Sequence, residues 1–493
     1  MTPSLTTLPP EIKYRIAGYL AGARREGDSA TGKGDLPGYA NRVAKYTTIS
    51  KEWQEIFESF VFKDLFVTST RLPYVASVIN AKRLKYLDQI FLLVQLPATT
   101  MEGCGRAEND DEKARNSKIV DSMVSSLFNS CLVAWKRHQV SHSGITLQIR
   151  VMAPTDYIAM AGTSRWGYHT IHGGTMVNHR SFFSDVGTRS FEDSFLELST
   201  PLPQAECIST LKMGDVHSTR NFSAYAYGSL LRALPSLQDV KLHTFAVRNA
   251  RLCHRQDNNL IYTRLMTTER GVDTLSCTLR EISYGLTTLQ VLGPIGPQFF
   301  WPLGGSKKAQ SNTHWPRLKS LGAHLHFVQP GGTYLFKHTI QNRQLGRACQ
   351  KCVWEANSGP LNKLYSAVAK AASKMPKLEV LALRVMVAPG PLWHEFRFQL
   401  VDGRRAYLCW ISDPLFEPSE EVLRLWKEVA DARDLALNVV IARASPSEQD
   451  YVDNKDGTMF IREYENEEPW NTLPAKEGEE SADNDDDDDD DDD

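Results

Sequence analysis

The spacing of apolar residues along the chain predicts alternating strands and helices beyond an N-terminal helical segment. A strand is expected where apolar and polar residues alternate, and a helix where apolar residues recur every three or four positions. Strands are expected at 89–96, 145–151, 237–245, 318–328, 378–387 and 435–442. Helices are expected at 118–136, 225–234, 361–374 and 419–433. The pattern predicts a protein of the α+β or α/β class.

Three of these strands follow the same short sequence around a proline, in which a helix or loop ends and alternating leucines begin. The three copies are Leu234-Pro235-Ser236-Leu237, Trp315-Pro316-Arg317-Leu318 and Met375-Pro376-Lys377-Leu378. A leucine-rich repeat has this arrangement, because each unit buries its strand only against its neighbours. The copies are irregularly spaced, which favours an irregular, leucine-rich-repeat-like α/β array with long insertions. An ordinary α/β domain with helix–proline–strand junctions fits the same pattern.

Two hairpins are expected in the last third of the chain. Asp402-Gly403 lies between the alternating segments 395–401 and 406–411, which is a strong short-range signal for a hairpin. A smaller hairpin is expected around Asn454-Lys455-Asp456-Gly457, with residues 459–461 as one arm.

The N-terminal segment is expected to form three short helices. Ile12, Ile16 and Leu20 make one apolar stripe on a first helix that begins after Leu8 and Pro9. A second helix is expected to carry Val43 and Tyr46. A third begins after Ser50, a favourable N-cap, and has Trp53, Ile56, Phe57 and Phe60 on one face. Small helices with more apolar residues than their own core needs are suited to packing against a partner.

These N-terminal residues resemble the F-box. The resemblance lies in Leu8-Pro9-x-Glu11-Ile12-(x3)-Ile16-(x2)-Tyr19-Leu20, then Ile49-Ser50-Lys51-Glu52-Trp53, although the insert at 21–40 is longer than usual. Gln54-Glu55-Ile56-Phe57-Glu58 and Phe62-Lys63-Asp64-Leu65 look like the version found in fungal F-box-containing proteins. The C-terminal region is similar to those proteins at Met375-Pro376-Lys377-Leu378-Glu379, Phe396-Arg397-Phe398, Trp410 and Pro418-Ser419-Glu420-Glu421-Val422-(x3)-Trp426.

The resemblance implies an interaction protein. In the family, the Leu-Pro segment and the helix stripe pack on a Skp-type adaptor, which links to a cullin scaffold. The residues expected to bind that adaptor are Leu8, Pro9, Ile12, Ile16, Leu20, Ile49 and Trp53. The body would then select an unidentified protein target for ubiquitylation.

Charge divides the chain into two unequal parts. The net charge is −3, but residues 476–493 carry −12, so the preceding 475 residues carry +9. Nine consecutive aspartates end the chain and cannot bury apolar surface, so a disordered, solvated tail is expected. The expected organisation is an F-box-like helical domain at 5–65, an α/β body at 66–445, a small hairpin or linker at 446–475 and the acidic tail at 476–493.

No residue pattern predicts catalysis, a cofactor or a metal. Cys349-Gln350-Lys351-Cys352 is the sole Cys-x-x-Cys, and it lacks the second pair at similar spacing that a structural zinc site usually has. No Gly-rich segment has the spacing of a phosphate loop or a dinucleotide site. The low cysteine density and the absence of a basic-then-apolar leader favour the cytoplasm or nucleus.

Two functions follow from the sequence. The first is an F-box adaptor that recruits a ubiquitin-ligase core, with neither a membrane nor a nucleic acid expected among its partners. The second is an acidic-tailed nuclear or chromatin-associated binding protein, in which the N-terminal helices are only a structural cap.

Overall fold

The structure is a computed structural model of the chain, which divides into two compact units, Met1–Lys455 and Asp456–Asp493. The residues it describes all belong to the first unit. They are 8–20, 45–48, 50–98, 108–136, 144–153, 195–214, 220–243, 273–293, 295–302, 310–340, 352–387 and 392–443. The expected second hairpin, the segment 446–475 and the acidic tail lie outside this part of the chain.

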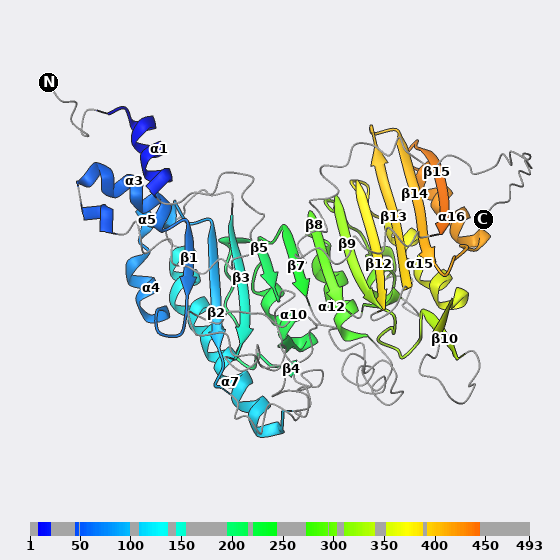
Figure 1. Cartoon of the computed structure of the whole chain (residues 1–493), viewed down its shortest axis with the longest axis horizontal. Helices are drawn as coiled ribbons and strands as arrows, with labels where there is room; N and C mark the ends of the chain where they lie inside the picture. The colour runs from blue at the N-terminus through cyan, green and yellow to red at the C-terminus, as the bar shows by residue number, and fades with distance from the viewer. Residues whose placement is uncertain are drawn as a thin grey trace, which may run out of the picture. The chain divides into compact units, whose positions relative to one another are not determined.

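The described residues build a mixed α/β fold around a sheet of 11 strands (Figure 1). Neighbouring strands in the sheet follow their order in the sequence. The strands are β1 (Asp64–Val67), β2 (Gln89–Gln95), β3 (Ile145–Met152), β5 (Ile208–Met213), β7 (Asp239–His243), β8 (Thr288–Gly293), β9 (Ser320–His326), β12 (Val380–Val387), β13 (Leu392–Val401), β14 (Arg405–Asp413) and β15 (Ala436–Arg443).

The sheet is mostly parallel. Every neighbouring pair from β1 to β12 is parallel, and so is the pair β14–β15. β13 runs antiparallel to both β12 and β14. The turn between β13 and β14 holds Asp402 and Gly403 at φ values of 51° and 72°, a left-handed backbone that glycine adopts freely and aspartate tolerates. The predicted hairpin is therefore confirmed.

Leucine-rich positions of successive strands stand in one continuous buried row. The row has one residue in register from each strand of the sheet except the last, β15: Leu65, Ile90, Leu147, Leu211, Val240, Leu289, Leu321, Leu381, Phe398 and Leu408. Nine of the ten are buried, and Leu65 on the first strand is half-buried. Because side chains alternate between the faces of a strand, the residues on either side of this row point to the opposite face.

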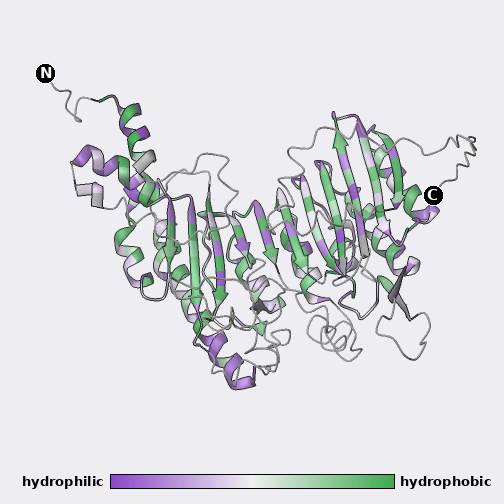
Figure 2. Cartoon of the chain, in the orientation of Figure 1, coloured by the Kyte–Doolittle hydropathy of each residue, from purple (hydrophilic) through white to green (hydrophobic). Residues whose placement is uncertain are grey.

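Helices cover the face of the sheet on which this row lies. They are α7 (Asp110–Leu127), α10 (Ala224–Arg232), α12 (Thr274–Ser283), α13 (Pro297–Phe300), α15 (Ser358–Ala372) and α16 (Glu420–Asp431). Figure 1 shows them along one side of the strands, and their buried residues share one hydrophobic cluster with the buried strand positions. The strands alternate between hydrophobic and hydrophilic residues (Figure 2), as expected for a sheet in which the described helices cover one face.

An aromatic cluster fills the core at the C-terminal end of the sheet. Tyr365 of α15 packs against Phe396 and Trp410, with ring centroids 4.9 and 5.7 Å away. Trp426 of α16 packs against Phe396 and Phe398 at 5.4 and 5.2 Å. These side chains lie inside the protein and join α15 and α16 to β13 and β14.

The predicted strands that the structure describes are all present, with bounds shifted by a few residues, and three further strands of the 11-stranded sheet were missed. β1, β5 and β8 were not predicted. In β5 the burial of alternate positions is interrupted, because the pairing with β3 shifts between Ile145 and Thr146 and leaves Ser209 and Thr210 both half-buried. A bulge of this kind breaks the period of two that identifies a strand in a sequence.

The predicted helices are present where they were expected, but their first and last residues differ from the prediction. The helix predicted at 118–136 begins at Asp110, where Asn109 and Glu112 form a capping box, and passes through a π-helical turn, η3 (Phe128–Leu132), into α8 (Val133–Lys136). Between the first and third N-terminal helices the structure describes only a 3-10 turn, η2 (Lys45–Thr48), which contains Tyr46. Val43 lies outside the described residues.

Candidate functional site

The N-terminal residues expected to bind a partner form a small helical unit, which consists of α1 (Pro10–Leu20), η2 and α3 (Lys51–Val61). Ser50 caps α3 as predicted, since its Oγ accepts a hydrogen bond from the Trp53 amide at 3.3 Å. The unit has its own hydrophobic cluster of Ala17, Trp53, Ile56 and Phe57. This cluster is separate from the core of the sheet.

The predicted apolar stripe of α1 is only partly buried. Its most buried side chains are Lys13, 2% exposed, and Ala17, 0% exposed. Ile12, by contrast, is 39% exposed and Tyr14 is 45% exposed. The Lys13 ammonium donates a hydrogen bond to the Glu52 carboxylate of α3 at 2.6 Å, so an ion pair joins the two helices beside the contact of Ala17. Apolar surface on α1 is thereby left open to a partner.

The predicted partner-binding residues fall into three groups. Pro9 and Ile12 are exposed, and Leu8 and Ile16 are half-buried at the start and middle of α1. Trp53 is 4% exposed, and its ring stacks on that of Phe57 with the ring centroids 5.6 Å apart. It therefore stabilises the helical unit from within. Ile49 and the side chain of Leu20 lie outside the described residues.

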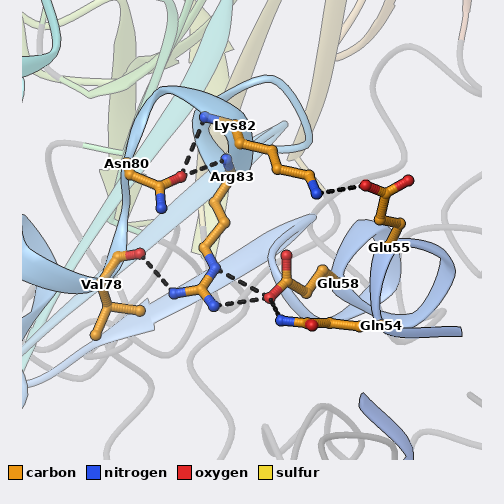
Figure 3. A network of polar contacts seen from close by, with 7 residues as sticks. All are labelled: Gln54, Glu55, Glu58, Val78, Asn80, Lys82 and Arg83. Carbon is orange, nitrogen blue, oxygen red and sulfur yellow. Dashed lines mark hydrogen bonds and ion pairs between the residues drawn. The ribbon is translucent and has the colours of Figure 1, made fainter. Parts of the chain in front are cut away.

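A polar junction connects α3 to the short helix α5 (Ala81–Leu84), which follows α4 (Leu72–Val78) on the sheet side (Figure 3). Arg83 donates hydrogen bonds from Nε and Nη2 to Glu58 Oε1, at 3.2 and 2.7 Å. Lys82 pairs with Glu55 at 2.5 Å, at the surface. Asn80 caps α5 by accepting hydrogen bonds from the amides of Lys82 and Arg83. Two ion pairs therefore join the helical unit to the sheet domain.

Glu58 is the better buried acid of this junction. Burial alone would raise its pKa, but hydrogen bonds from Arg83 and Gln54 and the positive charge of Arg83 outweigh it, so the pKa lies below its usual value. The Arg83 guanidinium also lies 4.7 Å from the ring centroid of Phe62, the residue that ends α3. Since β1 starts at Asp64, only Lys63 separates Phe62 from the sheet, and the predicted domain boundary at 65/66 falls inside this strand.

Sequence reasoning missed three features of the site: the exposure of Tyr14, the burial of Lys13 and the Glu58–Arg83 pair. Tyr14 lies off the stripe of Ile12 and Ile16, so helical periodicity alone does not mark it. Lys13 precedes Ala17 by one helical turn, which was the available signal that both share a face. Glu58 and Arg83 lie on different helices, and nothing local in the sequence connects them.

The described residues contain no group of three or more His, Cys, Asp or Glu side chains that could hold a metal ion. The prediction for the Cys349–Cys352 pair stays untested, because Cys349 and the side chain of Cys352 lie outside this part of the chain. No helix in the described ranges is both long and apolar enough to cross a bilayer.

The fold and its N-terminal helical unit define a mixed α/β protein with a large, mostly parallel sheet and separate helices packed at its first edge. Residues 340–462 match the model of a family of unknown function, DUF6546. The match includes the aromatic cluster of α15, β13, β14 and α16 but less than half of the chain. The same comparison detects no F-box family, so the F-box resemblance stays a prediction. No curated protein matches the chain.

Proposed function

We propose that this protein is an F-box adaptor, a substrate-recognition subunit of a cullin-RING ubiquitin ligase that acts in the cytoplasm or nucleus. The helical unit would bind a Skp-type adaptor, and the sheet domain would hold a protein target. The observation that carries the proposal is α1, which packs on α3 through Ala17 and Lys13 and leaves Ile12 exposed close to the exposed Pro9.

The exposed side of α1 is suited to packing against another helix. Pro9 and Ile12 are exposed apolar residues at the start of this helical segment and do not belong to the cluster around Trp53. Tyr14 lies on another side of α1, where its ring centroid is 6.5 Å from that of Phe60. Aromatic and aliphatic side chains that become fully covered dominate the energetics of protein interfaces. A partner that covers this side of α1 would therefore gain most of its affinity from Pro9 and Ile12.

The polar junction supports the same function. A ligase adaptor has to hold its target at a defined position relative to the scaffold. Two ion pairs from neighbouring residues of α5 to α3 restrict rotation between the helical unit and the sheet domain. The Glu58–Arg83 pair and the short link from Phe62 to β1 serve this purpose.

Co-purification of the full chain with a Skp-type adaptor tests the proposal. The variant Pro9→Ala/Ile12→Ala removes exposed apolar surface, and burying one aliphatic side chain contributes roughly 1.5–3 kcal/mol. Because 1.4 kcal/mol corresponds to a factor of ten in affinity, we expect adaptor binding to weaken by at least about tenfold. The variant Leu8→Ala/Pro9→Ala should act in the same direction.

Tyr225→Ala is the matched control, since Tyr225 is 62% exposed on α10, far along the sequence from α1. It should bind the adaptor as the unaltered chain does. If the unaltered chain does not bind a Skp-type adaptor at all, the second function, a nuclear or chromatin-associated binding protein, becomes the better explanation. If Pro9→Ala/Ile12→Ala binds the adaptor as tightly as the unaltered chain does, the exposed residues of α1 are not the binding surface.

A further inference from the structure

The last strand of the large sheet, β15, is an edge strand with exposed apolar side chains. It pairs with β14 on one side and ends the strand order of the sheet (Figure 1). Val439 is 44% exposed and Ile441 is 40% exposed. Leu437, on the same face of the strand, is half-buried and packs against the main hydrophobic core. Within the described part of the chain, β15 therefore presents three apolar side chains beside an open edge of the sheet.

β15 has few of the features that keep edge strands from pairing with other chains. Proteins protect such strands by shortening them or by placing lysine, proline or a bulge in them. β15 is 8 residues long, pairs with β14 in unbroken register, and contains neither lysine nor proline. Its one charged residue, Arg443, is the last of the strand. By contrast, β1 at the other edge of the sheet is only 4 residues long.

The backbone groups that point out from this edge belong to the residues of the apolar row. The Ala436 amide donates a hydrogen bond to the Arg404 carbonyl, on the β14 side, at 2.9 Å. The residues whose N–H and C=O groups face a given neighbour alternate along a strand. Those of Leu437, Val439 and Ile441 therefore point away from β14, and a further strand would form its hydrogen bonds with these three residues.

We infer that β15 pairs with β15 of a second copy of this chain, in antiparallel orientation about a twofold axis at Val439. In this register Val439 lies opposite its own counterpart, and Leu437 lies opposite Ile441 of the second copy. Each pair joins residues whose backbone groups point outward, so the two residues exchange hydrogen bonds and their side chains lie on one face. The same surface is used by both copies, as a twofold interface requires.

The charges at the two ends of β15 favour a second copy over an unrelated strand. The register places Arg443 opposite Leu435 of the second copy, and so next to its Asp434. Asp434 is exposed, and the Arg443 side chain is 73% exposed although its Nε donates to Asp413 Oδ1 at 3.0 Å. The twofold axis repeats this contact at the other end of the strand. A parallel pair would instead place two arginines side by side, and like charges oppose pairing.

The inferred interface is independent of the proposed adaptor surface. β15 and β1 lie at opposite edges of the sheet, and the helical unit joins the sheet next to β1. Pairing at β15 therefore leaves α1 of each copy uncovered, and it is measured without an adaptor. Failure of the dimer assay is thus distinguishable from failure of the adaptor assay.

Analytical ultracentrifugation of the full chain at increasing concentration tests the inference, and a dimer is the expected species at high concentration. Val439→Lys places two lysines opposite each other at the axis, so it should raise the dimer dissociation constant by at least about tenfold. Val439→Pro removes an amide that points away from β14 and should act in the same direction. Val78→Lys is the matched control, since Val78 is 38% exposed on α4, and it should dimerise within about twofold of the unaltered chain.

Four outcomes would overturn the inference. They are a full chain that is monomeric at every concentration, a dimer that Val439→Lys leaves intact, an equal loss of dimer in Val78→Lys, and a dimer that forms only when residues 444–493 are removed. The first would leave the edge to a strand of another protein, and the last would assign it to a segment of the same chain.

Hydrogen exchange of the unaltered chain decides the question if neither Val439 variant folds. The amides of Leu437, Val439 and Ile441 should exchange more slowly as the protein concentration rises, because pairing gives each of them a carbonyl acceptor. The amide of Val78 should show no such dependence. Exchange at β15 that does not change with concentration would contradict the inference.

Discussion

Arg83 on α5 donates two hydrogen bonds to a single carboxylate oxygen of Glu58 on α3, from Nε at 3.2 Å and from Nη2 at 2.7 Å. The Glu58 side chain is 5% exposed and that of Arg83 is 26% exposed. This pair is the better protected of the two ion pairs between the helical unit and the sheet domain, because Lys82 and Glu55 are both largely open to water.

Glu58→Gln should therefore destabilise the fold more than the matched change Glu55→Gln. Removing the charge from a buried carboxylate weakens two charge-assisted hydrogen bonds, and with allowance for the partial exposure of Arg83 the expected loss is about 1–2 kcal/mol. Glu55→Gln should leave the free energy of unfolding unchanged within error, because exposed ion pairs are screened by solvent. Urea denaturation of the three proteins measures this, and equal losses would show that burial of Glu58 is unimportant.

Stability should fall as the pH is lowered from about 6.5 towards 4, and the buried histidines are the cause. Burial lowers the pKa of His394 from 6.5 to about 3 and that of His326 to about 4. Below pH 6.5 the unfolded chain therefore binds protons at both positions while the folded chain does not, which favours unfolding by up to about 1.4 kcal/mol per pH unit for each group.

Two acids oppose this trend, because burial raises the pKa of Asp64 and of Asp273. Burial raises the pKa of Asp273 from 3.8 to about 6, so the folded chain binds a proton there between pH 6 and 4 before the unfolded chain does. The two histidines act in the same direction as Glu58 and Asp121, whose pKa values are lowered by hydrogen bonds that outweigh burial, so we expect a net loss of stability despite the two raised aspartates. His394→Gln keeps a polar side chain beside the Tyr365 hydroxyl but cannot titrate, so the pH slope should become shallower. Denaturation curves at pH 7 and pH 5 test this, and an unchanged slope in the variant would contradict it.

Trp426→Ala should be among the most damaging single changes to the C-terminal part of the sheet domain. Trp426 is fully buried and lies against the rings of Phe396 and Phe398. Truncation of a buried tryptophan leaves a cavity and typically costs about 3–5 kcal/mol. Leu415→Ala is the control, since Leu415 is 45% exposed. A similar melting temperature for both variants would mean that the aromatic cluster is not the core of this region.

The sequence alone determined eight of the 11 strands of the large sheet and several of the helices. Local periodicity identified the strands that became β2, β3, β7, β9 and β12 to β15, and the Asp402-Gly403 turn identified the hairpin, because these signals arise from neighbouring residues. Ser50 was recognised as the cap of α3 for the same reason. The apolar stripe of α1 likewise indicated the surface on which the proposed function rests.

Only the tertiary structure decided which face of each strand and helix is buried. The order of strands, the bulge in β5 and the helix-free face follow from pairing between distant segments, which local spacing does not encode. Lys212 and Lys241 become neighbours only because β5 and β7 pair in that register. In the same way, the inward turn of Lys13 and Ala17 on α1 depends on α3, since which side of a helix is buried is set by the partner it packs against.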